Sequence, residues 1–79
     1  MRDWTVDGEA VRARRLALRM TQRTFARECG LALSFIKLVE QGRSQPGDVN
    51  GLLLTDVLEC DISDIAVRKE PASSSGSAA

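Results

Sequence analysis

The stretch TQRTFARECGLALSFIKLVE, residues 21–40, determines the fold that the sequence predicts. Apolar residues around Phe25 recur at helical spacing and predict the buried face of a short helix, which Thr21 can cap through its hydroxyl. Gly30 follows at the point where a helix end favours a left-handed residue without a Cβ atom. A second helix is predicted over about residues 32–41. The stretch therefore predicts two short helices packed across a tight turn.

Such a pair of helices is the outline of a helix-turn-helix, whose second helix enters the major groove of DNA. A plain helical hairpin has the same outline, so the motif alone leaves both interpretations open. Ile36 and Val39 are the inward positions of the second helix. The remaining positions form an outward face of Leu33, Ser34, Lys37 and Leu38, with Phe35 on its flank.

Length and composition predict one soluble globular domain. The chain has 79 residues, of which 43% are hydrophobic and 28% are charged. No apolar run approaches the ~20 residues that span a bilayer, and the first residues lack the apolar segment of a signal peptide. We therefore expect a cytoplasmic protein with no membrane partner.

The types of reactive residue argue against a metal site and against catalysis. The chain has two cysteines, Cys29 and Cys60, and no histidine, so no zinc site of standard ligand count is available. Both cysteines are expected in the core as small apolar residues, with a disulfide or redox switch as the alternative. No cofactor is implied. Without histidine or tyrosine, no acid–base or nucleophilic constellation can be named, and we expect no enzyme activity.

Charge is distributed unevenly along a chain of zero net charge. Residues 8–45 hold eight basic and three acidic side chains, and residues 46–79 hold two basic and six acidic ones. A basic half joined to an acidic half predicts a polarised surface that suits a polyanionic partner. A chance division of solvated charges is the alternative.

The remaining elements are predicted from caps and apolar spacing. A first helix follows Asp7 and runs to about Arg19, and a fourth begins at Asp48 or Asn50 and runs to about Glu59. The apolar residues expected to form the core face of that fourth helix are Leu53, Leu54, Val57 and Leu58. Asp61 caps a short fifth helix with Ile62 and Ile65 as its apolar pair, and Val67 extends that stripe. Residues 1–7 are expected to be a short arm with Trp4 over the core edge, and residues 69–79 a disordered tail.

A wider set of residues carries a family resemblance over residues 8–65. The matching positions are Val11-Arg12 and Arg15, Met20-Thr21-Gln22, Phe25-Ala26, Gly30-Leu31, Ile36, Glu40-x-Gly42, Pro46 and Leu58-x-Cys60-Asp61-Ile62-x-x-Ile65. In these residues the chain resembles the lambda-repressor/Cro-like, or XRE-type, DNA-binding domain. The resemblance implies an all-α, compact five-helix bundle over residues 8–68. It implies a transcriptional regulator, with a repressor as the expected role, that binds double-stranded DNA as a homodimer.

The same resemblance assigns roles to individual residues. It implies a salt bridge between Arg15 and Glu40, and a phosphate contact from Gln22, which would also brace the recognition helix. It implies backbone phosphate contacts in the loop that follows that helix, and a dimer contact near the last helix, for which the candidates are Ile62, Ile65 and Val67. Packing of these apolar residues in the core is the alternative. The full set expected at the DNA is Gln22, Arg23, Ala32, Leu33, Ser34, Lys37, Leu38, Arg43, Ser44 and Gln45.

The recognition helix departs from the family pattern. Its outward face usually carries side chains that hydrogen-bond to base edges, whereas this chain offers two leucines, one serine and one lysine. Ala32 also replaces the usual hydroxyl N-cap. Two interpretations follow: a DNA reader in which Leu33 and Leu38 contact thymine methyl groups, or a protein-interaction module such as an antirepressor, an antitoxin-like partner or an accessory subunit. The second would use the apolar patch Leu33, Phe35 and Leu38.

Overall fold

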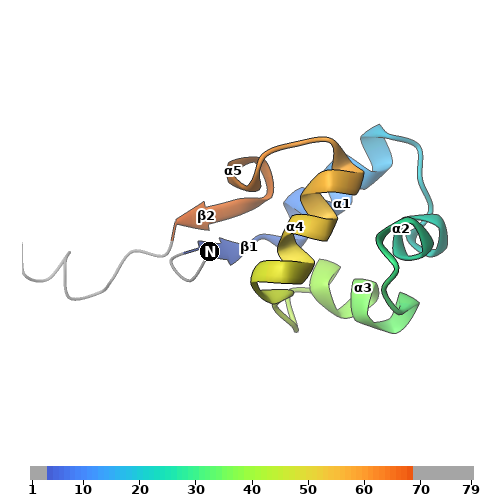
Figure 1. Ribbon diagram of the computed structural model, residues 1–79, viewed down its shortest axis with the longest axis horizontal. Coiled ribbons are helices and arrows are strands. Elements are labelled where there is room, and N and C mark those ends of the chain that lie inside the picture. The colour runs from blue at the N-terminus through green and yellow to red at the C-terminus, as the bar shows by residue number, and fades with distance from the viewer. Residues whose placement is uncertain (1–3, 69–79) are drawn as a thin grey trace, which may run out of the picture.

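A computed structural model describes residues 4–68 and gives five helices and two short strands (Figure 1). The elements, in chain order, are β1 (Trp4–Val6), α1 (Gly8–Ala17), α2 (Gln22–Cys29), α3 (Leu33–Glu40), α4 (Gly47–Leu58), α5 (Ile62–Ile65) and β2 (Ala66–Arg68). The expected five-helix bundle is confirmed. The expected tail, residues 69–79, lies outside the described residues.

Four of the helices end in the same hydrogen-bonded turn. Each has one residue of positive φ after its last turn: Arg19 at 60°, Gly30 at 74°, Gly42 at 76° and Glu59 at 56°. The residue after it donates its N–H back to a carbonyl five positions earlier, as Leu31 does to Ala26 at 2.9 Å. This is the Schellman motif, which satisfies the last carbonyls of a helix within a few residues. The helices can therefore be short and can change direction abruptly.

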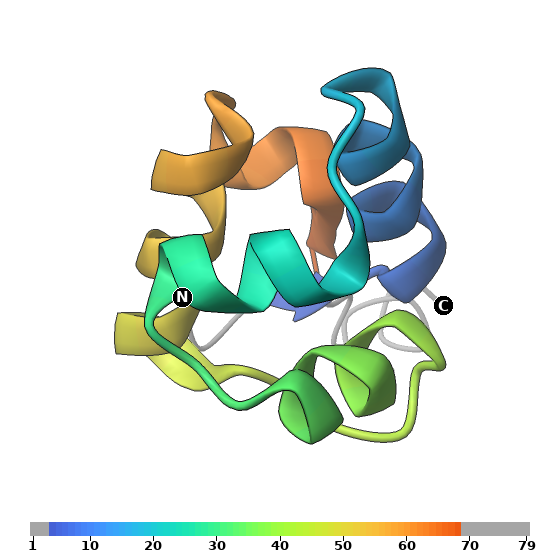
Figure 2. The same ribbon diagram turned by 90° about the vertical axis from the view of Figure 1, so that its right-hand side faces the viewer.

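The core lies where α1, α2, α3, α4 and α5 meet. In Figure 2, α2 crosses the front of the molecule with α1 on one side, α4 on the other and α3 below. The buried apolar residues are Val6, Val11, Phe25, Ala26, Cys29, Ile36, Val39, Leu54, Leu58, Ile65 and Ala66. Every helix contributes to this cluster, so the helices stabilise one another by sharing one apolar interior.

Residues 4–6 of the expected N-terminal arm are instead part of the fold, and residues 1–3 lie outside the described residues. Residues Trp4–Val6 form β1, which pairs antiparallel with β2 in the register Trp4↔Arg68 and Val6↔Ala66. The N–H of Asp7 also donates to the carbonyl of Ile65 at 2.7 Å. Trp4 packs partly buried against the core, as expected. A three-residue strand has too little apolar alternation to be detected in the sequence, because its pairing depends on a partner about sixty residues away.

Helix α4 differs from the prediction in its start and in its buried face. It begins at Gly47, and its buried residues are Gly51, Leu54, Thr55 and Leu58. These four positions follow the i, i+3, i+4, i+7 spacing of one helix face. Leu53, predicted in the core, is 38% exposed and Val57 is only partly buried. Leu54 and Leu58 are buried as predicted. The prediction for Leu53 and Val57 was wrong because it followed apolar residue type, whereas the helix buries Gly51 and Thr55 instead.

Two smaller features complete the described fold. The short helix α5 has Asp61 in the N-cap position, where the Asp64 carboxylate accepts a hydrogen bond from the Asp61 N–H at 2.9 Å. Cys29 and Cys60 are both free thiols, Cys29 buried and Cys60 partly buried. Within residues 4–68, no group of three or more cysteine, aspartate or glutamate side chains could hold a metal ion. None of the helices in that part of the chain combines the length and apolarity that a membrane crossing requires.

Candidate nucleic-acid interface

The turn between α2 and α3 fixes the relative positions of the two helices. The Thr21 hydroxyl accepts a hydrogen bond from the Thr24 N–H at 3.0 Å and caps α2, as the sequence predicted. Gly30 ends α2 in the left-handed conformation, and Leu31 then packs partly buried against the core. Ala32 is extended and makes no side-chain cap, so α3 begins without the hydroxyl cap typical of the family. The packing of Leu31 and the backbone hydrogen bond from Leu31 to Ala26, rather than a side-chain cap on α3, therefore stabilise the turn.

Helix α3 has one buried side and one open side. Ile36, Val39 and Glu40 are buried, at 0%, 1% and 8% exposure. Ser34, Lys37 and Leu38 are exposed, as predicted. Leu33 was predicted to point outward, but it is only partly exposed and packs against the core, as does Phe35. We call Leu33, Ser34, Lys37 and Leu38 the outer face of α3.

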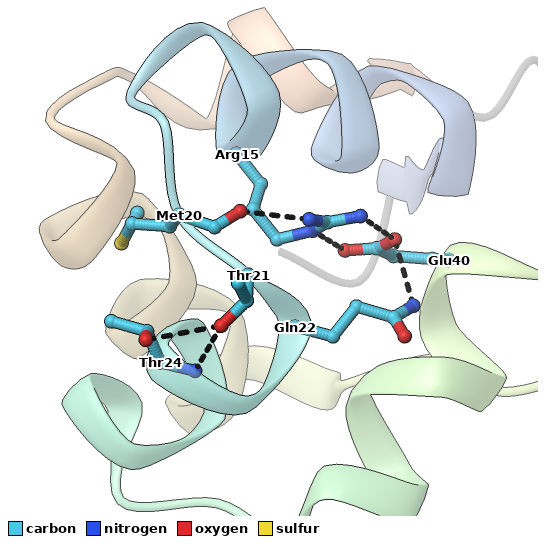
Figure 3. A network of polar contacts seen from close by, with 6 residues as sticks. All are labelled: Arg15, Met20, Thr21, Gln22, Thr24 and Glu40. Atoms are coloured by element: carbon cyan, nitrogen blue, oxygen red, sulfur yellow. Dashed lines mark hydrogen bonds and ion pairs between the residues drawn. The ribbon is translucent and has the colours of Figure 1, made fainter.

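A buried ion pair connects α1 to the end of α3 (Figure 3). Arg15 donates from Nε to Glu40 Oε2 at 2.7 Å and from Nη2 to Oε1 at 3.0 Å. Its third nitrogen, Nη1, donates to the carbonyl of Met20 at 2.8 Å. The side chains of Arg15 and Glu40 are only 7% and 3% exposed. This paired geometry satisfies both charges where water cannot, and it is the contact that the resemblance implied.

Gln22, in the first turn of α2, joins the same network. Its Nε2 donates to Glu40 Oε1 at 3.1 Å, which braces α2 against α3 (Figure 3). A side-chain amide carries two N–H donors, so one remains for another acceptor. Arg23 beside it is exposed. The bracing role that the resemblance gave to Gln22 is therefore present, and its phosphate contact stays a prediction.

The loop after α3 holds its three candidate residues in different ways. Gly42 turns the chain, and the Arg43 N–H donates to the Leu38 carbonyl at 2.9 Å. The Arg43 side chain is exposed. Ser44 is partly buried. Gln45, expected at a phosphate, bonds β1 through its amide: Oε1 accepts from the Val6 N–H at 2.8 Å and Nε2 donates to the Val6 carbonyl at 3.1 Å, while its phosphate contact stays a prediction. The sequence could not show this bond, because β1 was not predicted.

The residues suggested for a dimer contact are separated by the fold. Ile65 is fully buried in the monomer and is not available to a partner. Ile62 is partly buried, and Val67 is 59% exposed but lies on strand β2 rather than on a continued helix. Exposed apolar residues also lie on α4, where Val49 and Leu52 are 73% and 61% exposed and line a groove together with Asp64 of α5.

Two residues that position the interface were missed from the sequence. Gly8 packs so closely under the carbonyls of Val39 and Glu40 that a Cβ atom would overlap them. Arg14 donates from Nη2 to the carbonyls of Leu58 and Glu59, at 3.3 and 3.2 Å, at the end of α4. A glycine in the first turn of a helix was the available signal for the first. Nothing distinguishes Arg14 from its basic neighbours in the sequence.

The basic and acidic halves of the sequence occupy different elements. Exposed cations lie on α1, on α2 and around α3, among them Arg23, Lys37 and Arg43. The exposed acids of the second half lie on α4, α5 and the turn between them, where a shallow groove is lined by Val49, Leu52, Leu53, Thr55, Asp56, Glu59, Cys60, Asp61 and Asp64. The outer face of α3 carries one cation, Lys37, and the elements before and after α3 carry Arg23 and Arg43.

Comparisons with known proteins agree with this geometry. The family model described as helix-turn-helix matches residues 11–65. Among solved structures, the restriction-modification controller protein C.AhdI from Aeromonas hydrophila is similar, with 32% identity and a TM-score of 0.69 over 72% of this chain and 86% of that one. No curated protein sequence matches the chain. The chain therefore belongs to the XRE-type helix-turn-helix family of DNA-binding transcriptional regulators.

Proposed function

We propose that this chain is a sequence-specific repressor that binds double-stranded DNA in the cytoplasm and inserts the outer face of α3 into the major groove. The observation that carries the proposal is the open side of α3, which presents Lys37, together with the exposed cations Arg23 in the first turn of α2 and Arg43 in the loop after α3. Phosphate contacts from such cations supply most of the affinity of DNA-binding domains and fix their register. The protein would act without catalysis, by blocking access of the polymerase.

Salt dependence tests the DNA-binding part of the proposal. Three cationic contacts in each protomer of a dimer would lower the affinity by about three orders of magnitude between 50 and 200 mM salt. Fluorescence anisotropy with a labelled duplex, recovered from a random DNA library, measures this slope. Binding that is insensitive to salt, or the failure to recover any duplex, would remove the proposal.

Individual cations sharpen the test. Replacing Arg23 or Arg43 by Ala should weaken binding to all sequences and reduce the salt slope by about one for each phosphate that is no longer neutralised. Arg68→Ala is the matched control, because Arg68 is an exposed arginine on β2 in the acidic half of the chain. An equal effect of all three substitutions would mean that the cations around α3 have no special role.

The protein-interaction alternative rests on a smaller patch than the sequence suggested. Leu33 and Phe35 pack partly against the core, and of the three residues only Leu38 is exposed, at 39%. One leucine among exposed polar groups suits a wet, charged DNA groove better than an apolar protein interface, whose centre is dry. We therefore favour DNA as the partner of this face.

A homodimer is the second part of the proposal. Val49, Leu52 and Leu53 are exposed on α4, beside the groove that extends to α5. Such apolar exposure on a small domain is typical of a contact with another chain. A second copy placed there would leave both α3 helices free, as two successive major grooves about 34 Å apart require.

Sedimentation velocity of the wild type and of Leu52→Glu tests the dimer. We expect the variant to be a folded monomer, because Leu52 is 61% exposed and its replacement leaves the core intact. Leu16→Glu is the control, at an exposed leucine on α1. Asp56 and Asp64 line the same groove, so salt should strengthen the dimer while it weakens DNA binding. A monomeric wild type at all concentrations would contradict this part alone.

A further inference from the structure

The outer face of α3 lacks the side chains that usually read bases. At about 100° per residue, Leu33 and Leu38 lie at the two edges of an arc of about 140°, and Ser34 and Lys37 fill the space between them. Residues 33–39 contain no arginine, asparagine or glutamine, and Lys37 is the one side chain among them that can make paired hydrogen bonds, to guanine. Readout of adenine by paired hydrogen bonds is therefore not available from this helix.

The neighbouring amides lie outside α3 and are partly used inside the protein. One donor of Gln22 is used on Glu40, and the amide of Gln45 is bonded through both its oxygen and its nitrogen to Val6. The nearby arginines, Arg23 and Arg43, also lie outside α3, one in the first turn of α2 and one after Gly42. Base discrimination at the centre of the contact falls to the outer face itself, where the two leucines stand beside Ser34 and Lys37.

The major groove offers one apolar feature to a leucine, the C5 methyl group of thymine. Leu38 is 39% exposed in the free protein, so it has apolar surface that such a contact would remove from water. Leu33 is partly exposed at the start of the same helix, about 7.5 Å away along the axis, which corresponds to roughly two base-pair steps. Lys37 between them can donate to a guanine or to a phosphate.

We propose that Leu38, assisted by Leu33, determines specificity by contact with thymine methyl groups, so that the operator half-site is read through methyl positions and not through paired hydrogen bonds to adenine. The inference rests on the proposed DNA-binding function and adds the chemical feature of the operator that is recognised. It also assigns the open surface of Leu38 to DNA rather than to a protein partner.

Removing single methyl groups from the DNA tests this proposal. In the duplex recovered from the random library, each thymine is replaced in turn by deoxyuridine, which keeps base pairing and phosphate charge and removes only the methyl group. The full chain is titrated by anisotropy. We expect one or two positions per half-site to weaken binding by about two- to fourfold, the effect of leaving one buried methyl group without its contact.

A protein variant links the methyl effect to its residue. At one of these positions, the one that Leu38 contacts, Leu38→Ala should bind the thymine and deoxyuridine duplexes almost equally well, because the shortened side chain no longer reaches the methyl group. Leu16→Ala, at an exposed leucine on α1, should keep the difference. Leu38→Gln should select adenine at the position where the wild type selects thymine.

Each other outcome has a definite meaning. Salt-dependent binding that is unchanged by every deoxyuridine substitution overturns this inference and leaves the proposed function standing. A methyl effect that persists unchanged at every position in Leu38→Ala also overturns it. A Leu38→Ala variant that binds every DNA as the wild type does but no longer retains a protein partner assigns the face to protein recognition. Absence of any salt-dependent DNA binding removes the proposed function itself.

Discussion

At the scale of single residues, local strain and desolvation decide several properties. Arg19 and Glu59 occupy left-handed positions that glycine adopts at no steric cost, with φ of 60° and 56°. Cys29 is buried in the core, 6% exposed, with its sulfur 4.0 Å from the Leu53 carbonyl. Neither feature belongs to the DNA contact, so both can be tested without changing recognition.

Glu59→Gly is expected to stabilise the protein. Glycine relieves the left-handed strain at the end of α4, and the backbone carbonyl that accepts from Arg14 is retained. We expect the free energy of unfolding to rise by about 0.5–1 kcal/mol, measured by urea denaturation. Glu28→Gly in the last turn of α2, where φ is negative, is the control and should lower stability. Loss of stability in Glu59→Gly would show that the glutamate is not strained there.

The pKa of the Cys29 thiol gives a pH-dependent prediction. Burial, with a smaller contribution from the Glu28 charge, raises this pKa from 9.0 to about 11. The folded state therefore favours the protonated thiol, so its contribution is complete below pH 9 and is lost as the pH rises to about 11. Urea denaturation between about pH 8 and pH 11 should show a steeper loss of stability in the wild type than in Cys29→Ala. Parallel curves for the two proteins would contradict the raised pKa.

At the scale of elements, α1 holds the recognition helix by charge and by close approach. Arg15 bonds the end of α3, and Gly8 lets the first turn of α1 reach the carbonyls of Val39 and Glu40. These contacts set the angle of α3 without touching its outer face. Substitutions in them should therefore change stability and, through it, the presentation of α3.

The Arg15–Glu40 pair should show strong coupling. Arg15→Met alone leaves a buried carboxylate without its partner and should lower the free energy of unfolding by about 3–5 kcal/mol. Arg15→Met combined with Glu40→Leu should be less destabilising than Arg15→Met alone, because no unpaired charge remains. Chemical denaturation of the two single variants and the double variant measures the coupling. A double variant whose destabilisation equals the sum of the single effects would mean that the two side chains act independently.

Gly8→Ala tests the close approach. Within a helix, alanine normally stabilises relative to glycine by about 1 kcal/mol. Here the added Cβ would overlap backbone oxygens that cannot move as a flexible side chain does. We expect a net loss of about 1–3 kcal/mol in thermal or urea denaturation. A gain in stability would show that α1 and α3 can separate easily.

At the scale of the whole molecule, contacts between distant parts of the chain close the bundle. Strands β1 and β2 join the two ends of the described chain, and Gln45 bonds β1 to the loop that carries Arg43. Arg14 connects α1 to the end of α4. The elements that carry the recognition helix and the elements that carry the acidic groove are thus connected in one arrangement.

Gln45→Leu should loosen that arrangement. The variant removes two hydrogen bonds to Val6 and leaves its partly buried N–H and carbonyl without these partners. We expect a loss of about 1–2 kcal/mol in the free energy of unfolding. Gln41→Leu, at an exposed glutamine after α3, is the control. An unchanged stability of Gln45→Leu would return Gln45 to the set of residues free to contact DNA.

Local signals in residues 21–40 predicted the two helices and their turn, whereas the family resemblance was needed to interpret them as a helix-turn-helix. The cap at Thr21, the left-handed Gly30 and the inward positions Ile36 and Val39 act within a few residues, and the structure has each of them. The Arg15–Glu40 pair came from family resemblance, since no spacing rule relates residues that far apart.

Contacts and burial that depend on distant partners are visible only in the folded chain. The Gln45 amide bonds to β1, Ile65 lies in the core, and α4 buries Gly51 and Thr55 rather than Leu53. In each case the side chain's environment is set by an element elsewhere in the chain, and residue type alone does not reveal it. Burial is a property of the assembled bundle, whereas caps and turns are properties of the local chain.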